Sequence, residues 1–215
     1  LVGCGRISKN HFDAFQAHSK DAELVAVCDT DPRALEMAAQ SQKVEGYSDL
    51  NQLLDRSNAD VVVLATPSGL HSQQAIQTAR AGKHIVTEKP MATRWADGLR
   101  MVEACDTAGV RLFVVKQNRL NPTLQLLKRA VQQRRFGKIY MCTVNVFWSR
   151  PQDYYDSAKW RGTWEFDGGA LMNQASHYID LMDWVVGPIE SVHATIGTLA
   201  RNIEVEDTAV MAVRW

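Results

Sequence analysis

The chain has 215 residues and carries 24 basic and 24 acidic side chains, so its formal net charge is zero. This length is enough to bury a substantial core and to hold one domain and part of a second. The charge balance and the 46% hydrophobic share argue against a polyanion-binding protein or a disordered tail, and no apolar run approaches the roughly 20 residues needed to cross a membrane.

The cysteines and histidines suggest neither disulfides nor a metal site. None of the four cysteines forms a CxxC pair, and we expect reduced thiols in a cytoplasmic protein. The six histidines show no ligand spacing, so we predict no metal. The chain starts at Leu1 and stops at Trp215 inside a strand-like run, so we expect it to be cut at both ends. The sequence leaves open whether a signal peptide precedes Leu1.

Apolar strand-like segments alternate with helical segments as far as Val115. This alternation predicts a parallel, right-handed, doubly wound sheet. We expect Asp31, Ser48 and Thr93 to cap helices, and Gly82 and Gly109 to end them. The predicted strands are residues 1–2, 23–28, 61–65, 85–87 and 112–115, and the predicted helices cover residues 7–17, 32–38, 50–54, 70–81 and 94–108.

The pattern changes after about Asn118. A helix at Thr123–Gln133 precedes three long strand-like stretches without intervening crossover helices. They predict a second α/β domain with an open, mainly antiparallel sheet. We place the boundary near residues 117–122, which gives domains at 1–118 and 119–215. The three predicted strands are Ile139–Phe147, Ser191–Leu199 and Thr208–Trp215.

A glycine-rich turn, Gly3-Cys4-Gly5-Arg6-Ile7, joins the first strand to the first helix. Its glycines let the backbone approach a pyrophosphate, and the helix N-terminus favours negative charge. The third position of the fingerprint is Ser8, so the motif alone also fits an ordinary tight turn. Asp29 ends the second strand, where a carboxylate can accept a bond from a ribose 2′-OH and repels a 2′-phosphate. This favours NAD over NADP, unless Asp29 merely begins a turn.

Two further strand ends carry candidate residues. Ala65-Thr66-Pro67 and His71 follow the third strand, where they can face a cofactor, although His71 can instead cap or pack at the helix start. Glu88-Lys89-Pro90 ends the next strand, and a lysine there points into the crevice where α/β sheets bind ligands. A desolvated lysine exchanges its proton more easily near neutral pH. Glu88 can orient Lys89 or bind the nicotinamide ribose; the alternative is a structural ion pair.

The second half offers a histidine and an aromatic, basic segment. Asn173 and His177 have the spacing of one helix face. An imidazole can take a hydroxyl proton near pH 7 and Asn173 can bond a substrate hydroxyl, although a lone histidine is usually structural. In Trp160-Arg161-Gly162-Thr163-Trp164 the indoles can stack on a sugar or base while Arg161 grips a carboxylate or phosphate. The alternative is a tryptophan cluster at a domain interface. Lys159, Arg119 and Arg150 are further candidate anion ligands.

Together these motifs resemble the glucose–fructose oxidoreductase / inositol dehydrogenase / rhizopine-catabolism (Gfo/Idh/MocA) family over essentially the whole chain. The resemblance implies a Rossmann domain, a second domain with a large open sheet that often makes oligomer contacts, and a nicotinamide cofactor between the two. The family's lysine and histidine positions fall on Lys89 and His177. Many members carry Asp four residues before the histidine, whereas this chain has Asn173, which cannot act as a base.

A narrower likeness follows from residues 116–119, 145–155, 159–170 and 173–177, which are similar to bacterial UDP-N-acetylglucosaminuronic acid 3-dehydrogenases. It implies NAD-dependent oxidation of a sugar C3 hydroxyl for lipopolysaccharide O-antigen, with Lys89 or His177 as the base. A dehydrogenase of a free sugar or inositol is the alternative. A non-catalytic NAD-sensing regulator would not need both Lys89 and His177. We expect a homo-oligomer, a dimer or tetramer, that binds neither nucleic acid nor membrane.

The candidate site residues form three sets. The catalytic residues are Lys89, His177 and Asn173. For NAD the candidates are Gly3, Gly5, Arg6, Ile7, Asp29, Ala65, Thr66, Pro67, His71, Glu88, Lys89 and Asn118. For the substrate they are Lys89, Arg119, Lys159, Trp160, Arg161, Trp164, Asn173 and His177.

Overall fold

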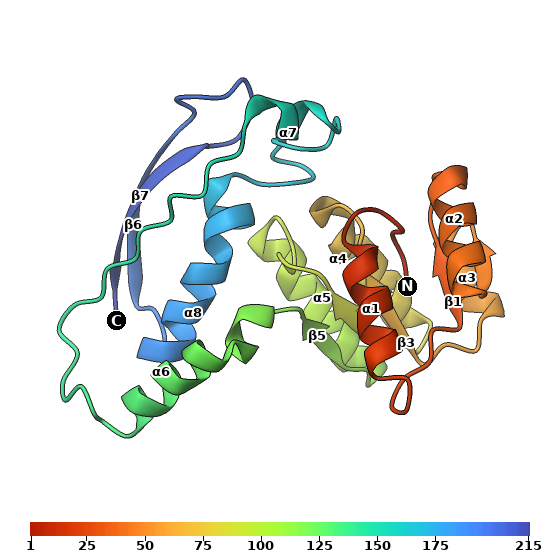
Figure 1. The fold of residues 1–215 in the computed structure, drawn as a ribbon, viewed down its shortest axis with the longest axis horizontal. Coiled ribbons are helices and arrows are strands. Elements are labelled where there is room, and N and C mark those ends of the chain that lie inside the picture. Colours follow the sequence, from red (N-terminus) through yellow and green to blue (C-terminus); the bar gives the residue numbers. More distant parts are fainter. The chain divides into compact units, whose positions relative to one another are not determined.

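Val2 lies at the centre of a parallel sheet in a computed structural model that describes residues 1–215 (Figure 1). The Val2 N–H donates to the Val63 carbonyl and the Val2 carbonyl accepts from the Ala65 N–H, both at 2.8 Å. Val2 forms parallel bridges to Cys28 on one side and Leu64 on the other, so the sheet order is β2-β1-Val2-β3-β4-β5. Its strands are β1 (Ala26–Cys28), β2 (Glu45–Tyr47), β3 (Val61–Leu64), β4 (His84–Thr87) and β5 (Leu112–Val114).

Helices cover both faces of this sheet, because alternate residues of each strand point to opposite sides. Val62 and Leu64 belong to a core with side chains of α3, α4 and α5, whereas Val63 and Ala65 belong to a second core with side chains of α1 and α2. The predicted doubly wound parallel sheet is confirmed. The helices are α1 (Ser8–Ala17), α2 (Pro32–Gln42), α3 (Leu50–Arg56), α4 (His71–Arg80) after the short turn η1 (Ser68–Leu70), and α5 (Trp95–Ala108).

Three predicted helix caps have different outcomes. Asp31 caps α2 by accepting the N–H groups of Arg33 and Ala34, as predicted. Asp49 caps α3, so the prediction of Ser48 is wrong. The prediction of Thr93 is wrong as well, because Arg94 takes the N-cap position of α5 and makes no side-chain cap bond. Ser48 and Thr93 each lie one residue too early to reach the N–H groups of the first turn.

One strand of the sheet was not predicted. β2 has three residues, of which Glu45 and Gly46 are exposed and only Tyr47 is buried. It pairs in parallel with β1 at the edge of the sheet. So short a segment with a single buried side chain shows no apolar periodicity, which is why the sequence pattern does not reveal it.

The chain divides into two compact units, Leu1–Val115 and Lys116–Trp215. In the second unit β6 and β7 pair in antiparallel register from Ser191 opposite Arg214 to Gly197 opposite Thr208. The two predicted strands at these positions are confirmed. The elements of this unit are η2 (Gln117–Leu120), α6 (Pro122–Gln132), α7 (Gln152–Asp156), a π-helix η3 (Leu171–Ala175), α8 (Ser176–Val186), β6 (Ser191–Gly197) and β7 (Thr208–Arg214).

The predicted strand Ile139–Phe147 is wrong. Its residues form no ladder with β6 or β7, and Figure 1 draws the segment as an extended thread. Alternating polarity produces a strand only where the backbone pairs with a neighbouring strand. Here side chains such as Tyr140, Met141 and Phe147 stay more than four-fifths exposed. Beside this segment a cavity of about 800 Å³ is lined by side chains of α8, β7 and residues 142–150.

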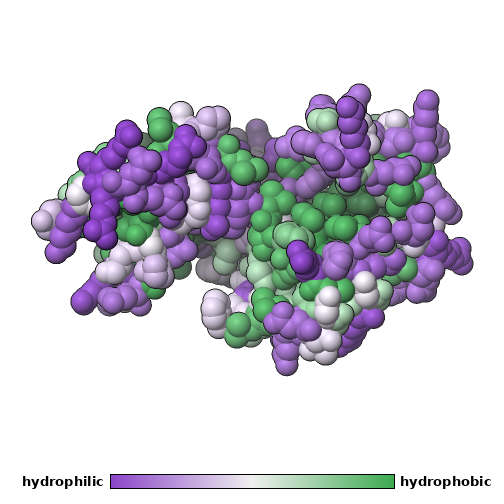
Figure 2. Space-filling view, turned by 90° about the horizontal axis from the view of Figure 1, so that it is seen from below, coloured by the Kyte–Doolittle hydropathy of each residue, from purple (hydrophilic) through white to green (hydrophobic).

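Polar residues dominate much of the surface seen in Figure 2, while apolar residues gather over part of the first unit. The exposed apolar side chains of that unit include Trp95, Leu99, Val102 and Phe113. No helix of the structure has the length and apolar character needed to span a bilayer.

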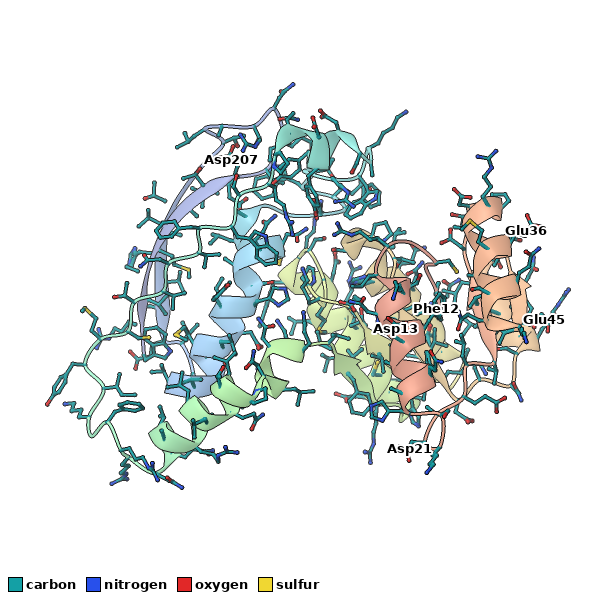
Figure 3. All side chains as sticks on the ribbon, viewed as in Figure 1. Phe12, Asp13, Asp21, Glu36, Glu45 and Asp207 are labelled. Atoms are coloured by element: carbon teal, nitrogen blue, oxygen red, sulfur yellow. The ribbon has the colours of Figure 1, made fainter.

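Asp207 closes the connection between β6 and β7 (Figure 3). Its carboxylate accepts the backbone N–H groups of Leu199 at 2.9 Å, Ala200 at 2.8 Å and Arg201 at 2.7 Å, and the hydroxyl of Thr208 at 2.8 Å. Partial burial by itself would raise the pKa of Asp207. The hydrogen bonds to the carboxylate outweigh it and lower the pKa to about 2.

This pKa predicts how acid affects the second unit. A carboxyl group whose folded pKa is depressed stabilises the fold above its unfolded pKa of about 4, and that contribution is lost as the pH falls through the folded value. We expect Asp207→Asn to lower the melting temperature at pH 7 by several degrees and to reduce its decline between pH 4 and pH 2. Thermal melts across this range measure both effects, with Asp55→Asn, at an exposed position of α3, as the control. Equal melting curves for the wild type and Asp207→Asn would contradict the assignment.

Candidate functional site

The two glycines of the glycine-rich turn differ in how closely other parts of the protein approach them. Gly3 has φ +94°, and a Cβ atom there would lie 2.6 Å from the Ala65 carbonyl oxygen. A Cβ atom on Gly5 would meet nothing within 4 Å. The protein's own packing therefore requires Gly3 but not Gly5. The open space beside Gly5, at the start of α1, suits close approach of a phosphate to the backbone.

Ser8 stands at the third position of the fingerprint, where a glycine or alanine is usual, and its contacts show why serine fits there. It is buried, and its hydroxyl donates to the Gly5 carbonyl at 2.7 Å. A small residue fits this position, as the fingerprint demands, and the hydroxyl also holds the turn. Arg6 and Ile7 are exposed on the same turn.

Asp29 connects this turn to the end of β1. Its Oδ2 accepts the Cys4 N–H at 2.7 Å, and its Oδ1 accepts the Asp31 N–H at 2.8 Å. Each carboxylate oxygen has a second lone pair, so the group can still accept bonds from a ligand hydroxyl. Burial and the nearby Asp29 charge raise the pKa of the Cys4 thiol to about 11, which keeps it protonated. Asp29 therefore does more than begin a turn, because its carboxylate fixes the glycine-rich backbone.

His71 joins two loops at the same edge of the sheet. Its Nδ1 lies 2.9 Å from the Pro90 carbonyl and its Nε2 lies 2.9 Å from the Thr66 carbonyl. The side chain is 1% exposed, and burial lowers its pKa although the two carbonyl contacts oppose this. Both ring nitrogens lie against carbonyls of the protein, which favours the packing alternative for His71 over direct contact with a cofactor. Its role is to position Thr66 and the residues around Pro90.

Glu88 attaches α1 to the loop that carries Lys89. Its Oε1 lies 3.0 Å from His11 Nε2, and its Oε2 accepts the Lys89 N–H at 3.3 Å. Burial alone would raise the pKa of Glu88, but the hydrogen bond and charge of His11 reverse the direction and lower it. Glu88 thus stays ionised beside the half-buried Lys89, and the Lys89–Pro90 peptide bond is cis.

The carboxyl ends of the parallel strands gather most of the predicted cofactor residues at one edge of the first unit. The Gly3 N–H donates to the Cys28 carbonyl at 2.8 Å, and the Glu88 N–H donates to the Leu64 carbonyl at 2.9 Å. Thr66 donates from its hydroxyl to Gln74 Oε1 at 2.6 Å. Asn118 is the exception among these residues, because it lies in η2 of the second unit.

Asp167 is a buried carboxylate that the sequence interpretation missed. Its side chain is 1% exposed and its Oδ2 accepts the Gly162 N–H at 2.8 Å. Its Oδ1 accepts a bond from the Asn173 side-chain amide. Asp167 therefore connects the segment around Trp160 and Arg161 to the π-helix that carries Asn173.

Glu206 is the second missed carboxylate, and it explains the glycine pair before η3. It is 5% exposed, and its Oε1 accepts the Leu171 N–H at 2.9 Å. A Cβ atom on Gly169 would overlap the Glu206 carboxylate, and Gly168 has φ +77°. A carboxylate at a helix N-terminus is favourable because the first N–H groups lack partners there. Glycines directly before a helix were the only sequence signal for it.

Asn173 and His177 lie in two consecutive helices of different type. Asn173 is half-buried in the π-helix η3, whereas His177 is 7% exposed in the first turn of α8. The expected regular helix is therefore interrupted. Such π segments are frequent at functional sites because they re-aim side chains.

Arg119 is engaged by an acid of its own unit. Its Nε and Nη2 donate to the two oxygens of Asp180 at 2.9 and 2.6 Å, and Lys116 Nζ lies 3.6 Å from the same carboxylate. Asp180 lies in α8, three residues after His177. Because the Arg119 guanidinium already binds the Asp180 carboxylate, this ion pair competes with the predicted contact of Arg119 with a substrate. Of the other candidates, Lys159 and Trp164 are exposed and Trp160 and Arg161 are half-buried.

The structure contains no group of three or more His, Cys, Asp or Glu side chains placed to hold a metal ion. All four cysteines are free.

A Rossmann sheet with a glycine-rich turn, followed by an α/β unit, is typical of NAD-binding oxidoreductases. Residues 1–116 match the family model described as oxidoreductase family, NAD-binding Rossmann fold, and residues 124–215 match the GFO/IDH/MocA C-terminal domain. The chain belongs to the Gfo/Idh/MocA family, as its motifs predicted.

Similar proteins of known structure include the WlbA dehydrogenase from Bordetella pertussis in complex with NADH and UDP-GlcNAcA. It is 66% identical, with a TM-score of 0.99, over 100% of this chain and 66% of that one. The WlbA protein of Chromobacterium violaceum, with the same ligands, is 63% identical, with a TM-score of 0.98, over 100% of this chain and 62% of its own. D-apiose dehydrogenase of Paraburkholderia graminis is 35% identical over 70% of this chain and 38% of its own length. The chain thus spans two thirds or less of these relatives.

We expect His71→Asn to destabilise the first unit, because the shorter amide cannot reach both the Thr66 and the Pro90 carbonyl. The loss should be about 2 kcal/mol, the usual range for leaving a buried polar group without its partner. Denaturant unfolding measures it, with His18→Asn as the control, since the His18 side chain is 72% exposed. An unfolding free energy equal to that of the wild type would show that His71 does not hold the two loops.

Proposed function

We propose that this chain provides the NAD-binding and substrate-handling residues of a nucleotide-sugar dehydrogenase. The reaction is oxidation of the C3 hydroxyl of UDP-2-acetamido-2-deoxy-glucuronate to the 3-oxo sugar, for lipopolysaccharide O-antigen synthesis. One observation carries the proposal: 66% identity over the whole chain to a dehydrogenase solved with NADH and UDP-GlcNAcA. A second protein with the same two ligands, at 63% identity, supports it.

The first unit has the features that NAD needs. The open space beside Gly5 accommodates a pyrophosphate at the start of α1. Asp29 ends β1 with its carboxylate held by two backbone N–H groups, so it can accept a bond from the ribose 2′-OH and repels the 2′-phosphate of NADP. Residues 1–118 are the proposed NAD-binding domain, and Thr66, Glu88 and Lys89 lie at the same sheet edge.

Proton transfer falls to Lys89 or His177. NAD, when bound, accepts hydride from the carbon that is oxidised. The hydroxyl proton leaves that oxygen for the amine of Lys89 or the imidazole of His177. The Lys89 loop is fixed by His71 at Pro90 and by Glu88, while Asn173, an amide bonded to Asp167, can orient a hydroxyl but cannot take its proton.

Residues 119–215 are the proposed domain for substrate binding and oligomer contacts, in a dimer or tetramer. Within it, Lys159, Trp160, Arg161 and Trp164 are the proposed sugar and anion contacts. Four free cysteines, two of which have pKa values raised to about 11 by burial, suit a reducing cytoplasm.

A second candidate is a dehydrogenase of a free sugar or inositol. Myo-inositol 2-dehydrogenase of Thermotoga maritima is 29% identical over 100% of this chain, and a levoglucosan dehydrogenase solved with NADH and levoglucosan is 26% identical with a TM-score of 0.86. These identities are less than half of that to the Bordetella protein, so the nucleotide sugar is favoured. A non-catalytic NAD sensor is least favoured, because it would need neither Lys89 nor His177.

The test compares NAD reduction by the intact protein with UDP-GlcNAcA, with myo-inositol and with free glucose, followed by nicotinamide absorbance. The proposal expects turnover with the nucleotide sugar at concentrations where the free polyols give none. Turnover with inositol or glucose alone would favour the second candidate.

Lys89→Ala should lower kcat by at least a hundredfold, the usual contribution of a general acid or base, while NAD binding changes little. Steady-state kinetics and a cofactor titration measure the two effects. Lys20→Ala, at an exposed site, is the matched control. Wild-type turnover in the Lys89 variant would remove Lys89 from the chemistry.

Gly5→Ala should weaken NAD binding at least tenfold, or about 1.4 kcal/mol, because the methyl group enters the space proposed for the pyrophosphate. Its melting temperature should stay at the wild-type value, since no protein atom lies within 4 Å of the added Cβ. Gly3→Ala, by contrast, should lower the melting temperature. Cofactor titration and thermal melts separate the two glycines, and unchanged NAD affinity in Gly5→Ala would contradict the proposed cofactor position.

A further inference from the structure

Five residues of the second unit form a column in which aromatic rings and guanidinium groups alternate. The Arg150 Cζ lies 4.6 Å from the Trp148 ring centroid and 4.7 Å from that of Tyr154. The Arg161 Cζ lies 4.1 Å from the Tyr154 centroid and 5.1 Å from that of Trp160. We call these residues the arginine stack; they are Trp148, Arg150, Tyr154, Arg161 and Trp160.

The two guanidinium groups of the arginine stack lack counter-ions. Neither Arg150 nor Arg161 forms an ion pair in the structure, and Nε of Arg150 and Nε and Nη1 of Arg161 are buried without a hydrogen-bond acceptor. Guanidinium groups keep their charge at any ordinary pH. Burying part of a charged group without a partner is costly, and ring stacking offsets only some of that cost. An anion that reached the remaining N–H groups of both arginines would offset the rest.

The surroundings add positive charge. Arg201 donates from Nε to the Arg150 carbonyl at 2.6 Å and from Nη2 to the Ser149 hydroxyl at 3.3 Å, so a third guanidinium lies beside the stack. On α7 the carboxylate of Asp156 accepts from the Gln152 side chain at 2.9 Å rather than from an arginine. Three guanidinium groups are therefore gathered in this part of the second unit.

The arginine stack is tied to the residues proposed for catalysis in the same unit. Gly162, next to Arg161, donates its N–H to Asp167, and Asp167 also accepts from the Asn173 amide. The buried carboxylate thus fixes the stack relative to the π-helix just before His177.

We propose that the arginine stack binds the diphosphate of the nucleotide sugar, an inference that rests on the proposed function. A single carboxylate is satisfied by one arginine in bidentate geometry. Two guanidinium groups on one tyrosine ring, with a third arginine adjacent, match a ligand with two linked anionic groups. There are two alternatives: the arginine stack binds the carboxylate of the sugar, or it has only a structural role.

The test titrates the intact wild-type protein and two variants, Arg150→Gln and Arg161→Gln, with UDP by calorimetry. Each variant should weaken UDP binding at least tenfold, leave NAD affinity unchanged and bind UMP no worse than the wild type does. Arg135→Gln, at an exposed position after α6, is the matched control. Arg161→Lys keeps the positive charge but loses the bidentate guanidinium. This variant should retain the fold and bind UDP more weakly than the wild type does.

Three results would overturn the proposal. Wild-type protein that does not bind UDP excludes a diphosphate site. Unchanged UDP affinity with a lowered melting temperature in the variants makes the stack structural. Weakened binding of glucuronate with unchanged UDP affinity moves the site to the carboxylate. UDP binding that depends on the stack, without oxidation of UDP-GlcNAcA, would instead refute the proposed function and leave the diphosphate site standing.

Discussion

The close packing of Gly3 against the end of β3 determines where the functional groups of the first unit lie. Val2 forms parallel bridges to the segments of β1 and β3, so the glycine-rich turn leaves the sheet at its centre and at the carboxyl edge. Any side chain at position 3 would meet the Ala65 carbonyl. Only glycine allows the backbone at position 3 to lie this close to the end of β3. This close packing keeps the turn next to Asp29 and at the same sheet edge as Thr66 and Lys89.

Buried carboxylates perform the equivalent task in the second unit. Asp167 and Glu206 accept backbone N–H groups before and at the start of η3, and together they fix the residues that lead to His177. A buried charge is tolerated there because hydrogen bonds surround it. Arg150 and Arg161 lack such partners, which is why the arginine stack is interpreted as a ligand site and the two carboxylates as structural.

The sequence predicted the fold where the pattern is strong and local. The apolar runs at Val61–Leu64 and His84–Thr87 and the cap at Asp31 lie where they were expected, because burial and hydrogen bonding act over a few residues. The edge strand β2 escaped notice because three residues with one buried side chain show no period. The segment Ile139–Phe147 has the alternation of a strand but no pairing partner, and pairing is not encoded locally.

The candidate site was predictable only in part for the same reason. Motif spacing predicted Gly3, Asp29, Lys89 and His177 as site residues, because their proposed roles depend on position along strands and helices. It did not reveal that Asp180 engages Arg119, or that the two ring nitrogens of His71 lie 2.9 Å from the Pro90 and Thr66 carbonyls, because these contacts depend on how the chain folds back on itself. A lone acid such as Asp167 carries no sequence signal until the fold brings backbone N–H groups to it, and for Glu206 the only signal is the glycine pair before η3.

The central proposal is that this protein oxidises the sugar of a UDP-linked uronic acid. The most direct measurement is mass spectrometry of the sugar nucleotide after the intact protein has been incubated with UDP-GlcNAcA, NAD and 2-oxoglutarate. The account predicts a product lighter by two hydrogens, with the UDP group retained. An unchanged sugar nucleotide, recovered from protein that oxidises inositol or a free sugar under the same conditions, would contradict it.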